Sequence, residues 1–159
     1  MSTKQGDVSL INDPVAQDLL QSTNVAHLAY VWPDGTPRVT PIWFHWNGEE
    51  VVMASPPGMP KIKALKENPD VALTIDGDEW PYKVLLIRGK AKVDLVDGVA
   101  PEYADCAVRY FGTEAGEGWT QQVDSMFDHM VRFCVQPEWV GVLDFEQRFP
   151  SAIAGAMAG

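Results

Sequence analysis

The chain has 159 residues, 46% of them hydrophobic, and a formal net charge of −10 at pH 7. This length and composition predict one globular domain with a buried core. So acidic a surface repels the phosphates of nucleic acids and of anionic lipids, which argues against nucleic-acid and membrane partners. The first residues lack the basic and apolar stretches of a signal peptide, and no apolar run approaches the length of a membrane span. We therefore expect a cytoplasmic protein.

The cysteines and histidines do not indicate a metal site. Cys106 and Cys134 have neither metal-ligand spacing nor the pattern of a disulfide framework, and we expect buried thiols. His27, His45 and His129 lie far apart in the sequence and share no ligand spacing. We therefore predict no bound metal.

The first part of the chain predicts a short helix followed by antiparallel strands. Asp13 and Pro14 suit the N-cap and the first turn of a helix that continues to Leu20. Turn signals at residues 33–35 (Pro-Asp-Gly) and 47–48 (Asn-Gly) separate runs rich in strand-forming residues. A three-stranded meander is therefore predicted, with strands over residues 25–32, 38–46 and 50–54.

The rest of the chain predicts further strands with helices between them. The glycine-rich stretch 112–118 is expected to be a loop. The expected elements are a helix over 60–67, strands over 71–76, 82–95 and 133–145, and helices over 100–111 and 119–131. Six antiparallel strands with few helices predict a mainly β protein, a small β-barrel with flanking helices. We place the domain at residues 13–148, with flexible segments at 1–12 and 149–159.

A basic helix stands out in this acidic chain, with lysines at positions 61, 63 and 66. Pro60 suits its first turn, and Asn68-Pro69 ends it. A lysine in the first turn is unfavourable beside the helix dipole unless an anion binds there. Ser55, at the end of the preceding strand, can offer a hydroxyl to the same anion. The alternative interpretation is a solvated, lysine-rich helix face.

Arg38 is a second cation that we expect near this point. It begins the strand that the hairpin at 47–48 would pair with the strand ending at Ser55, and both residues lie at similar distances from the turn. The hairpin therefore predicts Arg38 and Ser55 as neighbours. Together with Lys61 they would bind a phosphate, to which arginine offers a planar fork. The alternative for Arg38 is a surface charge on an edge strand.

These segments, in this order, resemble a known family. The run HLAYVWPDGTPRVTPIWFHWNGEEVVMAS, then KIKALKENPDVAL and YKVLLIRGKAKV, is similar to the pyridoxamine 5'-phosphate oxidase-like FMN-binding split-barrel superfamily. The resemblance covers residues 14–145. It implies a six-stranded antiparallel split β-barrel that forms homodimers. It also implies that FMN, or in one branch the deazaflavin coenzyme F-420, binds at the dimer interface.

The resemblance implies three groups of cofactor-binding residues. One group would hold the phosphate, a second would lie along the flavin ring, and a third would reach the cofactor from the other subunit. In this order they are Ser55, Pro60 and Lys61; Arg38, Val39, Thr40, Pro41 and Ile42; and Trp80, Tyr82 and Lys83. No catalytic residue is assigned, and Tyr82 or Lys83 is the candidate for an acid or base near the ring.

The expected function is that of an FMN-dependent oxidoreductase, which passes hydride to or from a small planar substrate. The acidic chain favours FMN over F-420, whose polyglutamate tail needs basic surface, but the three lysines leave an F-420-dependent reductase open. Met59 and Pro60 depart from the family pattern, in which a small polar residue and often a basic one precede the lysine. This departure favours another alternative, a non-catalytic module that binds flavin, haem or another planar ligand.

Overall fold

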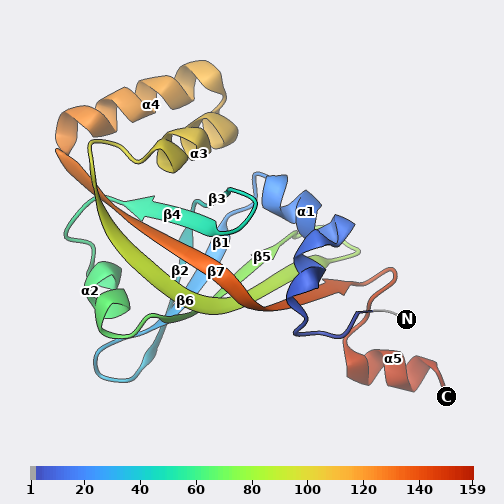
Figure 1. The fold of residues 1–159 in the computed structure, drawn as a ribbon. Coiled ribbons are helices and arrows are strands. Elements are labelled where there is room, and N and C mark those ends of the chain that lie inside the picture. The colour runs from blue at the N-terminus through green and yellow to red at the C-terminus, as the bar shows by residue number, and fades with distance from the viewer. Residues whose placement is uncertain (1–2) are drawn as a thin grey trace.

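One antiparallel sheet of seven strands and five α-helices make up the part of the chain that the computed structural model describes, residues 3–159 (Figure 1). The strands are β1 (Ala26–Val31), β2 (Pro37–Ile42), β3 (His45–Trp46), β4 (Val51–Ser55), β5 (Asp70–Asp76), β6 (Lys83–Asp97) and β7 (His129–Asp144). The helices are α1 (Pro14–Gln21), α2 (Pro60–Glu67), α3 (Pro101–Phe111), α4 (Thr113–Met126) and α5 (Ser151–Met157), preceded by the 3-10 helix η1 (Val8–Asn12). Within these residues, no helix combines the length and the apolar character that crossing a bilayer requires.

The two edges of the sheet are neighbours in sequence. Hydrogen bonds order the strands β2-β1-β5-β6-β7-β4-β3, so β2 and β3 are the edges, and only Trp43 and Phe44 separate them. Two residues cannot span more than about 11 Å between the strand ends, so the sheet must curl. The edges do not pair with each other among the described residues, which leaves the barrel split. The predicted mainly β, antiparallel split barrel is confirmed.

The sheet has seven strands and not six, because the strand expected over 38–46 is interrupted at Trp43 and Phe44. The predicted meander is therefore wrong in its second half. β1 and β2 pair as expected, but β4 pairs with β7, and only the short β3 returns along β4. Phe44 is fully buried in the barrel core, and this anchor turns the backbone out of the β2 direction.

The core is formed by the inward faces of the strands and by the helices that cover the barrel. Along β5, Val71, Leu73 and Ile75 are buried and alternate with less buried residues, as the two-residue period of a strand requires. α2 packs on β1 and β6 through Ile62 and Leu65, which lie three residues apart on one helix face. The helix predicted over 60–67 is confirmed.

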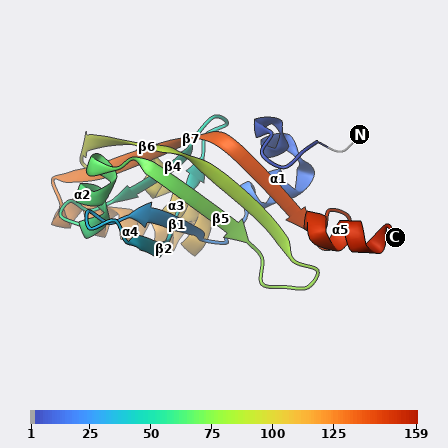
Figure 2. The same cartoon turned by 90° about the horizontal axis from the view of Figure 1, so that it is seen from below.

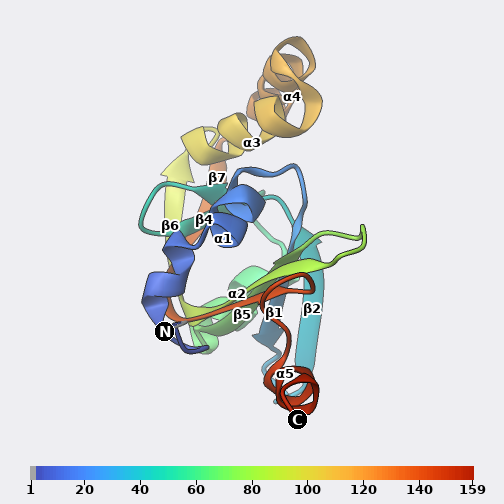
Figure 3. The same ribbon diagram turned by 90° about the vertical axis from the view of Figure 1, so that its right-hand side faces the viewer.

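α3 and α4 form a helical pair beyond one end of the barrel (Figure 3). The stretch 112–118, predicted as a loop, is helical from Thr113 onward. Gly112 alone separates the two helices, and its φ of 86° with a ψ of 168° is a backbone conformation that is open almost only to glycine. Gly116 lies where the helices touch, because a Cβ built there would be 2.6 Å from the backbone of Val108. The two glycines therefore allow α3 and α4 to be joined by one residue and to pack closely.

The N-terminal segment, predicted to be flexible, packs against β7. The side-chain amide of Gln5 donates to the Val142 carbonyl at 2.6 Å and accepts from the Val142 N–H at 2.9 Å. Leu10 and Ile11 of η1 are buried in the barrel core. From Gln5 onward the segment 1–12 thus makes specific contacts with the barrel, while its flexibility stays a prediction, and residues 1–2 lie outside the described part. At the other end, α5 has no buried residue.

We predict that Gly116→Ala lowers the free energy of unfolding by about 1–3 kcal/mol, because the added methyl group would overpack the contact with α3. Gly118 lies on the same helix, and a Cβ built there meets no atom within 4 Å. Gly118→Ala should therefore stabilise the protein by up to about 1 kcal/mol through helix propensity. Urea unfolding followed by circular dichroism measures both effects. Equal effects of the two substitutions would contradict the described packing of α3 on α4.

Candidate functional site

Ser55 and Lys61 flank the loop that joins β4 to α2, and both are buried. Ser55 is the last residue of β4 and lies on the same strand face as Val51 and Met53, which belong to the barrel core. Lys61 follows Pro60 in the first turn of α2. The exposed fractions of Ser55 and Lys61 are only 5% and 9%. The two residues predicted to bind a phosphate are thus polar groups inside the protein.

Neither of these side chains has a partner among the described residues. Ser55 Oγ makes no hydrogen bond, and none of the ion pairs includes Lys61. Burial lowers the pKa of the Lys61 ammonium below its ordinary value, because the charged form loses its water. A buried hydroxyl without a partner destabilises the fold, and so does the loss of water around the charged ammonium. A bound anion would satisfy both groups at once.

The start of α2 offers further donors to such an anion. The N–H groups in the first turn of a helix have no acceptor within the helix, and the helix dipole makes this end positive. Met59, at the N-cap position, provides no side-chain hydrogen bond to these groups, and Pro60 has no N–H of its own. The helix end is thus left uncapped beside Lys61, as an anion site requires.

Arg38 is not paired with Ser55 in the sheet, so the prediction that the hairpin makes them neighbours is wrong. Arg38 lies opposite Tyr30 on β1, and Ser55 lies opposite Val131 on β7. The Arg38 guanidinium donates to Thr36 Oγ1 at 2.7 Å. It also lies over the ring of Trp32, 5.5 Å from the ring centroid. Arg38 is therefore a surface cation on the edge strand, beside an aromatic ring.

The strand that follows Arg38 is a free edge of the sheet. β2 pairs only with β1 among the described residues, so half of its backbone N–H and C=O groups point away from the sheet. Val39 is 68% exposed, and Thr40 and Ile42 are half-buried. Pro41 contributes a carbonyl but no N–H. The predicted role of residues 39–42 beside a planar ligand stays a prediction.

Trp80, Tyr82 and Lys83 lie at the other end of the molecule. They belong to the turn between β5 and β6 and to the start of β6, and Figure 2 shows this turn far from α2. Trp80 is 68% exposed, and its ring meets that of Tyr82 edge to face at 5.4 Å. Lys83 Nζ is 3.9 Å from Glu146 Oε2. A single chain therefore does not bring these three residues to the α2 end.

Two further contacts were not predicted from the sequence. Phe145 packs against both Trp80 and Tyr82, which makes an aromatic cluster of the end of β7 and the start of β6. Arg109 of α3 donates to the Phe44 carbonyl and lies 4.7 Å from the centroid of the Phe44 ring. The second contact joins residues 65 positions apart, so no local pattern could have revealed it.

Comparisons with known proteins decide the family. The model of the family described as pyridoxamine 5'-phosphate oxidase matches residues 13–144. The chain belongs to the pyridoxamine 5'-phosphate oxidase family. The resemblance found over residues 14–145 of the sequence is therefore confirmed. No curated protein matches the chain.

Several solved structures share the fold of this chain. An F420 reductase is 30% identical, with a TM-score of 0.62, over 79% of this chain and 94% of its own. A conserved hypothetical protein from Mycobacterium tuberculosis is 22% identical, with a TM-score of 0.67, over 90% of this chain and 91% of its own. The heme storage protein HutZ from Vibrio cholerae is 21% identical, with a TM-score of 0.59, over 83% and 93%. The last two likenesses concern the fold alone.

The related structures differ in the ligand after which they are named, so the residues of this chain must indicate its own ligand. The related structures include proteins named for F420, for FAD and for heme. Among the described residues, no three His, Cys, Asp or Glu side chains gather as a metal ion would require. The buried, unpartnered Ser55 and Lys61 instead fit a phosphate-bearing ligand.

We predict that Lys61→Met stabilises the ligand-free protein on the order of 1 kcal/mol at pH 7, because it removes an ammonium that loses water on folding and has no ion-pair partner among the described residues. The folded-state pKa is lowered, so the unfolded chain binds more protons between the two pKa values. The destabilising effect of Lys61 is thus fully present at pH values below the lowered pKa and decreases as the pH rises from that pKa toward the ordinary value of 10.5. Thermal unfolding at pH 7 and near pH 10 tests this.

Lys63→Met is the matched control for this experiment, because Lys63 lies on the same helix but is exposed. It should change the free energy of unfolding little at either pH. A Lys61→Met protein that is equally destabilised at both pH values would contradict the prediction, since Lys61 would then stabilise the fold by packing alone.

Proposed function

We propose that this chain is an FMN-dependent oxidoreductase, which passes hydride to or from a small planar substrate. The observation that carries the proposal is the buried Ser55 Oγ, which has no hydrogen-bond partner, together with the buried Lys61 side chain, which has no ion-pair partner among the described residues, beside the uncapped start of α2. A phosphate monoester would accept a hydrogen bond from the hydroxyl and pair with the ammonium. The family supports a phosphate-bearing cofactor at this point.

Different residues would bind different parts of the cofactor. Ser55, Lys61 and the first-turn N–H groups of α2 would hold the phosphate, while Pro60 fixes the start of the helix. The free edge at 39–42 would lie along the flavin ring and orient it. Arg38 would add a second cation to the same site, reaching it from the edge strand. Bound FMN would supply the two-electron chemistry, and the chain would bind, orient and shield it.

A second copy of the chain would complete the site. Trp80, Tyr82 and Lys83 are far from α2 in their own chain, and the rings of Trp80 and Tyr82 are exposed. In a homodimer, this end of one chain would face the α2 end of the other. Tyr82 or Lys83 would then be the group near the ring that can hold or move a proton. The exposed aromatic area supports burial in such an interface.

A deazaflavin F-420-dependent reductase is a second candidate, and the F420 reductase at 30% identity favours it. The exposed lysines 63 and 66 on α2 offer some basic surface for a polyglutamate tail. The net charge of −10 opposes a polyanionic coenzyme and is the reason that FMN is preferred. A non-catalytic module for flavin or haem is the third candidate. Met59, which provides no hydroxyl at the start of α2, supports it.

We predict that the protein binds FMN and that Lys61→Ala weakens this binding by about 10- to 100-fold, the effect of losing one charge-assisted hydrogen bond. Ser55→Ala should weaken it by about three- to tenfold, as a neutral hydrogen bond would. Lys63→Ala is the control, because its side chain lies on the exposed face of the same helix. Quenching of flavin fluorescence during titration measures all four affinities.

Parallel titrations with coenzyme F-420 and with haem separate the three candidates. Binding of F-420 but not of FMN would transfer the proposal to the reductase. If neither flavin binds, or if Lys61→Ala has no effect, the oxidoreductase proposal is abandoned. A haem absorption band would then support the non-catalytic module. If FMN binds, oxidation of a reduced nicotinamide with the loaded protein tests turnover.

The shared site predicts that two defective variants restore each other. Lys61→Ala and Trp80→Ala would each impair FMN binding, because one removes the phosphate ligand and the other a contact from the partner chain. A mixed dimer contains one site with both substitutions and one site with neither. Refolding the two variants together should therefore restore tight binding at one site of each mixed dimer. A mixture that binds no better than the separate variants, although mass analysis finds mixed dimers, would exclude a shared site.

A further inference from the structure

A groove separate from the phosphate site lies between the outer face of α2 and the turn that joins β1 to β2. Its main hollow, of about 500 Å³, is lined by Trp32, Met59, Pro60, Ile62, Lys63 and Lys66, among others. A smaller hollow of about 260 Å³ adjoins it and shares Trp32 and Glu67 with it. The main hollow alone has the size of sites that take small organic molecules.

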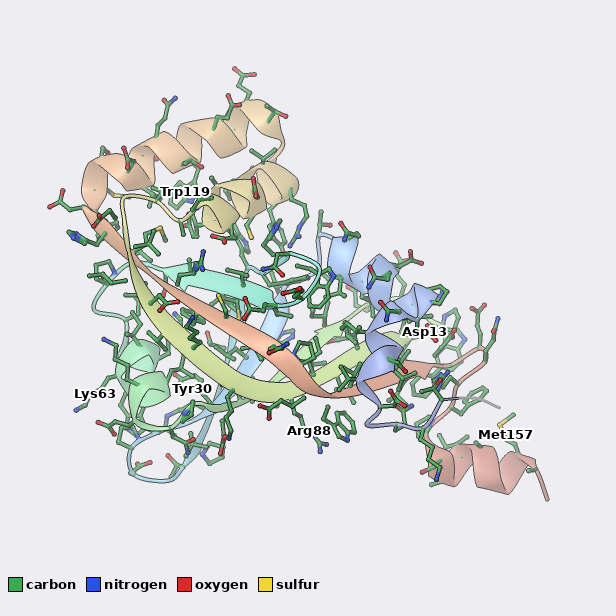
Figure 4. The ribbon with its side chains drawn as sticks, in the orientation of Figure 1. Asp13, Tyr30, Lys63, Arg88, Trp119 and Met157 are labelled. Carbon is green, nitrogen blue, oxygen red and sulfur yellow. The ribbon has the colours of Figure 1, made fainter. Side chains whose placement is uncertain are left out.

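The groove and the phosphate site lie on opposite faces of α2. At about 100° per residue, Lys63 is rotated roughly 200° from Lys61 around the helix axis. Lys61 is buried on the barrel side, whereas Lys63 and Lys66 are exposed. Figure 4 shows Lys63 pointing away from the barrel on the outer side of α2. A molecule in the groove would therefore not touch Lys61, although Pro60 borders both sites.

The floor of the groove is apolar. Trp32 provides an aromatic ring, and Met59 is 42% exposed although it is a large hydrophobic residue. Ile62 lies at the base and is almost fully buried. Apolar area exposed in a concave site gains free energy when a ligand covers it, at about 25 cal/mol per Å². A flat apolar group would pack against this floor.

The rim of the groove is positively charged in an acidic protein, because Lys63 and Lys66 line it. Glu67 is the acidic residue of the lining, so the cations prevail. The chain as a whole carries a net charge of −10. Because nearby charges determine the potential in a hollow, the groove attracts anions although the rest of the protein repels them.

We infer that this groove binds an aromatic monoanion, a fused two-ring carboxylate or sulfonate. The rings would lie on Trp32, Met59 and Ile62, and the anionic group would pair with Lys63 and Lys66. Neither an uncharged aromatic molecule nor a small inorganic anion would use both features of the groove. The site does not depend on the proposed FMN binding, because it uses the other face of α2.

The test is titration of the full-length protein with 2-naphthoate and with its uncharged analogue 2-naphthylmethanol, followed by calorimetry. We expect a dissociation constant for naphthoate below about 1 mM. The uncharged analogue should bind at least about tenfold more weakly, as the loss of one ion pair in a partly dry site implies. Lys63→Glu with Lys66→Glu should weaken naphthoate binding at least about tenfold for the same reason.

The matched control carries Lys4→Glu and Lys92→Glu, two exposed lysines outside the groove, and so has the same net charge. It should keep the affinity of the unaltered protein. An equal loss in the control would show a general charge effect and overturn the proposal. Equal binding of naphthoate and 2-naphthylmethanol would overturn the assigned anion, and no binding below about 1 mM would overturn the site.

Two further arms separate this site from the phosphate site. Saturating FMN and the substitution Lys61→Ala should both leave the naphthoate affinity unchanged, since the two sites meet only at Pro60, which offers neither ligand a charge or an N–H. Displacement of naphthoate by FMN, or its loss in Lys61→Ala, would assign the ligand to the phosphate site and overturn the groove proposal. If FMN fails to bind while naphthoate binds with the expected dependence on Lys63 and Lys66, the groove proposal stands and the proposed function does not.

Discussion

The long ladder between β6 and β7 determines the layout of the molecule. It runs from Lys83 opposite Asp144 to Asp97 opposite His129, and at about 3.3 Å per residue it spans roughly 50 Å of chain. Its register shifts once, between Arg88 and Gly89. A Cβ at Gly89 would lie 2.5 Å from the carbonyl oxygen of Gln136, so only glycine fits there. The ladder separates the β5–β6 turn from the α3–α4 pair, and neither end can fold back onto the other.

This separation gives the candidate site its composite character. The groups that suit a phosphate lie at the β4–α2 connection, and the exposed aromatic rings lie beyond the start of β6. A rigid ladder cannot bring the two together, so a complete site of the kind proposed needs two chains. Lys61 illustrates the cost of such a site. Burial of its side chain removes water from an ammonium that has no ion-pair partner among the described residues, which opposes folding, and a bound anion would recover this free energy.

The three lysines of α2 have different roles because a helix turns by about 100° per residue. Lys61 faces the barrel, while Lys63 and Lys66 face a groove with an apolar floor. One short helix thus presents cations to two surfaces in an otherwise acidic protein. Its start carries Met59 and Pro60, so the anchor for an anion there rests on a lysine, a serine and backbone N–H groups. Such a sparse set of donors explains why the sequence pattern alone left cofactor binding open.

The sequence by itself determined the bounds of α2, the antiparallel β class and the family. Proline and asparagine bounded α2 at the predicted residues, because their effects on the backbone act within one or two positions. The ordered segments from β1 to β6 sufficed to recognise the split barrel.

Only the tertiary structure decided strand partners and burial. The turn at Asn47-Gly48 forms as predicted, but Phe44 is buried in the core and interrupts the strand before it. β4 therefore pairs with β7, and Arg38 is not opposite Ser55 in the sheet. Contacts between distant segments, which no local pattern encodes, also decided three other features. They bury Lys61, pair Gln5 with Val142, and keep Trp80 away from α2.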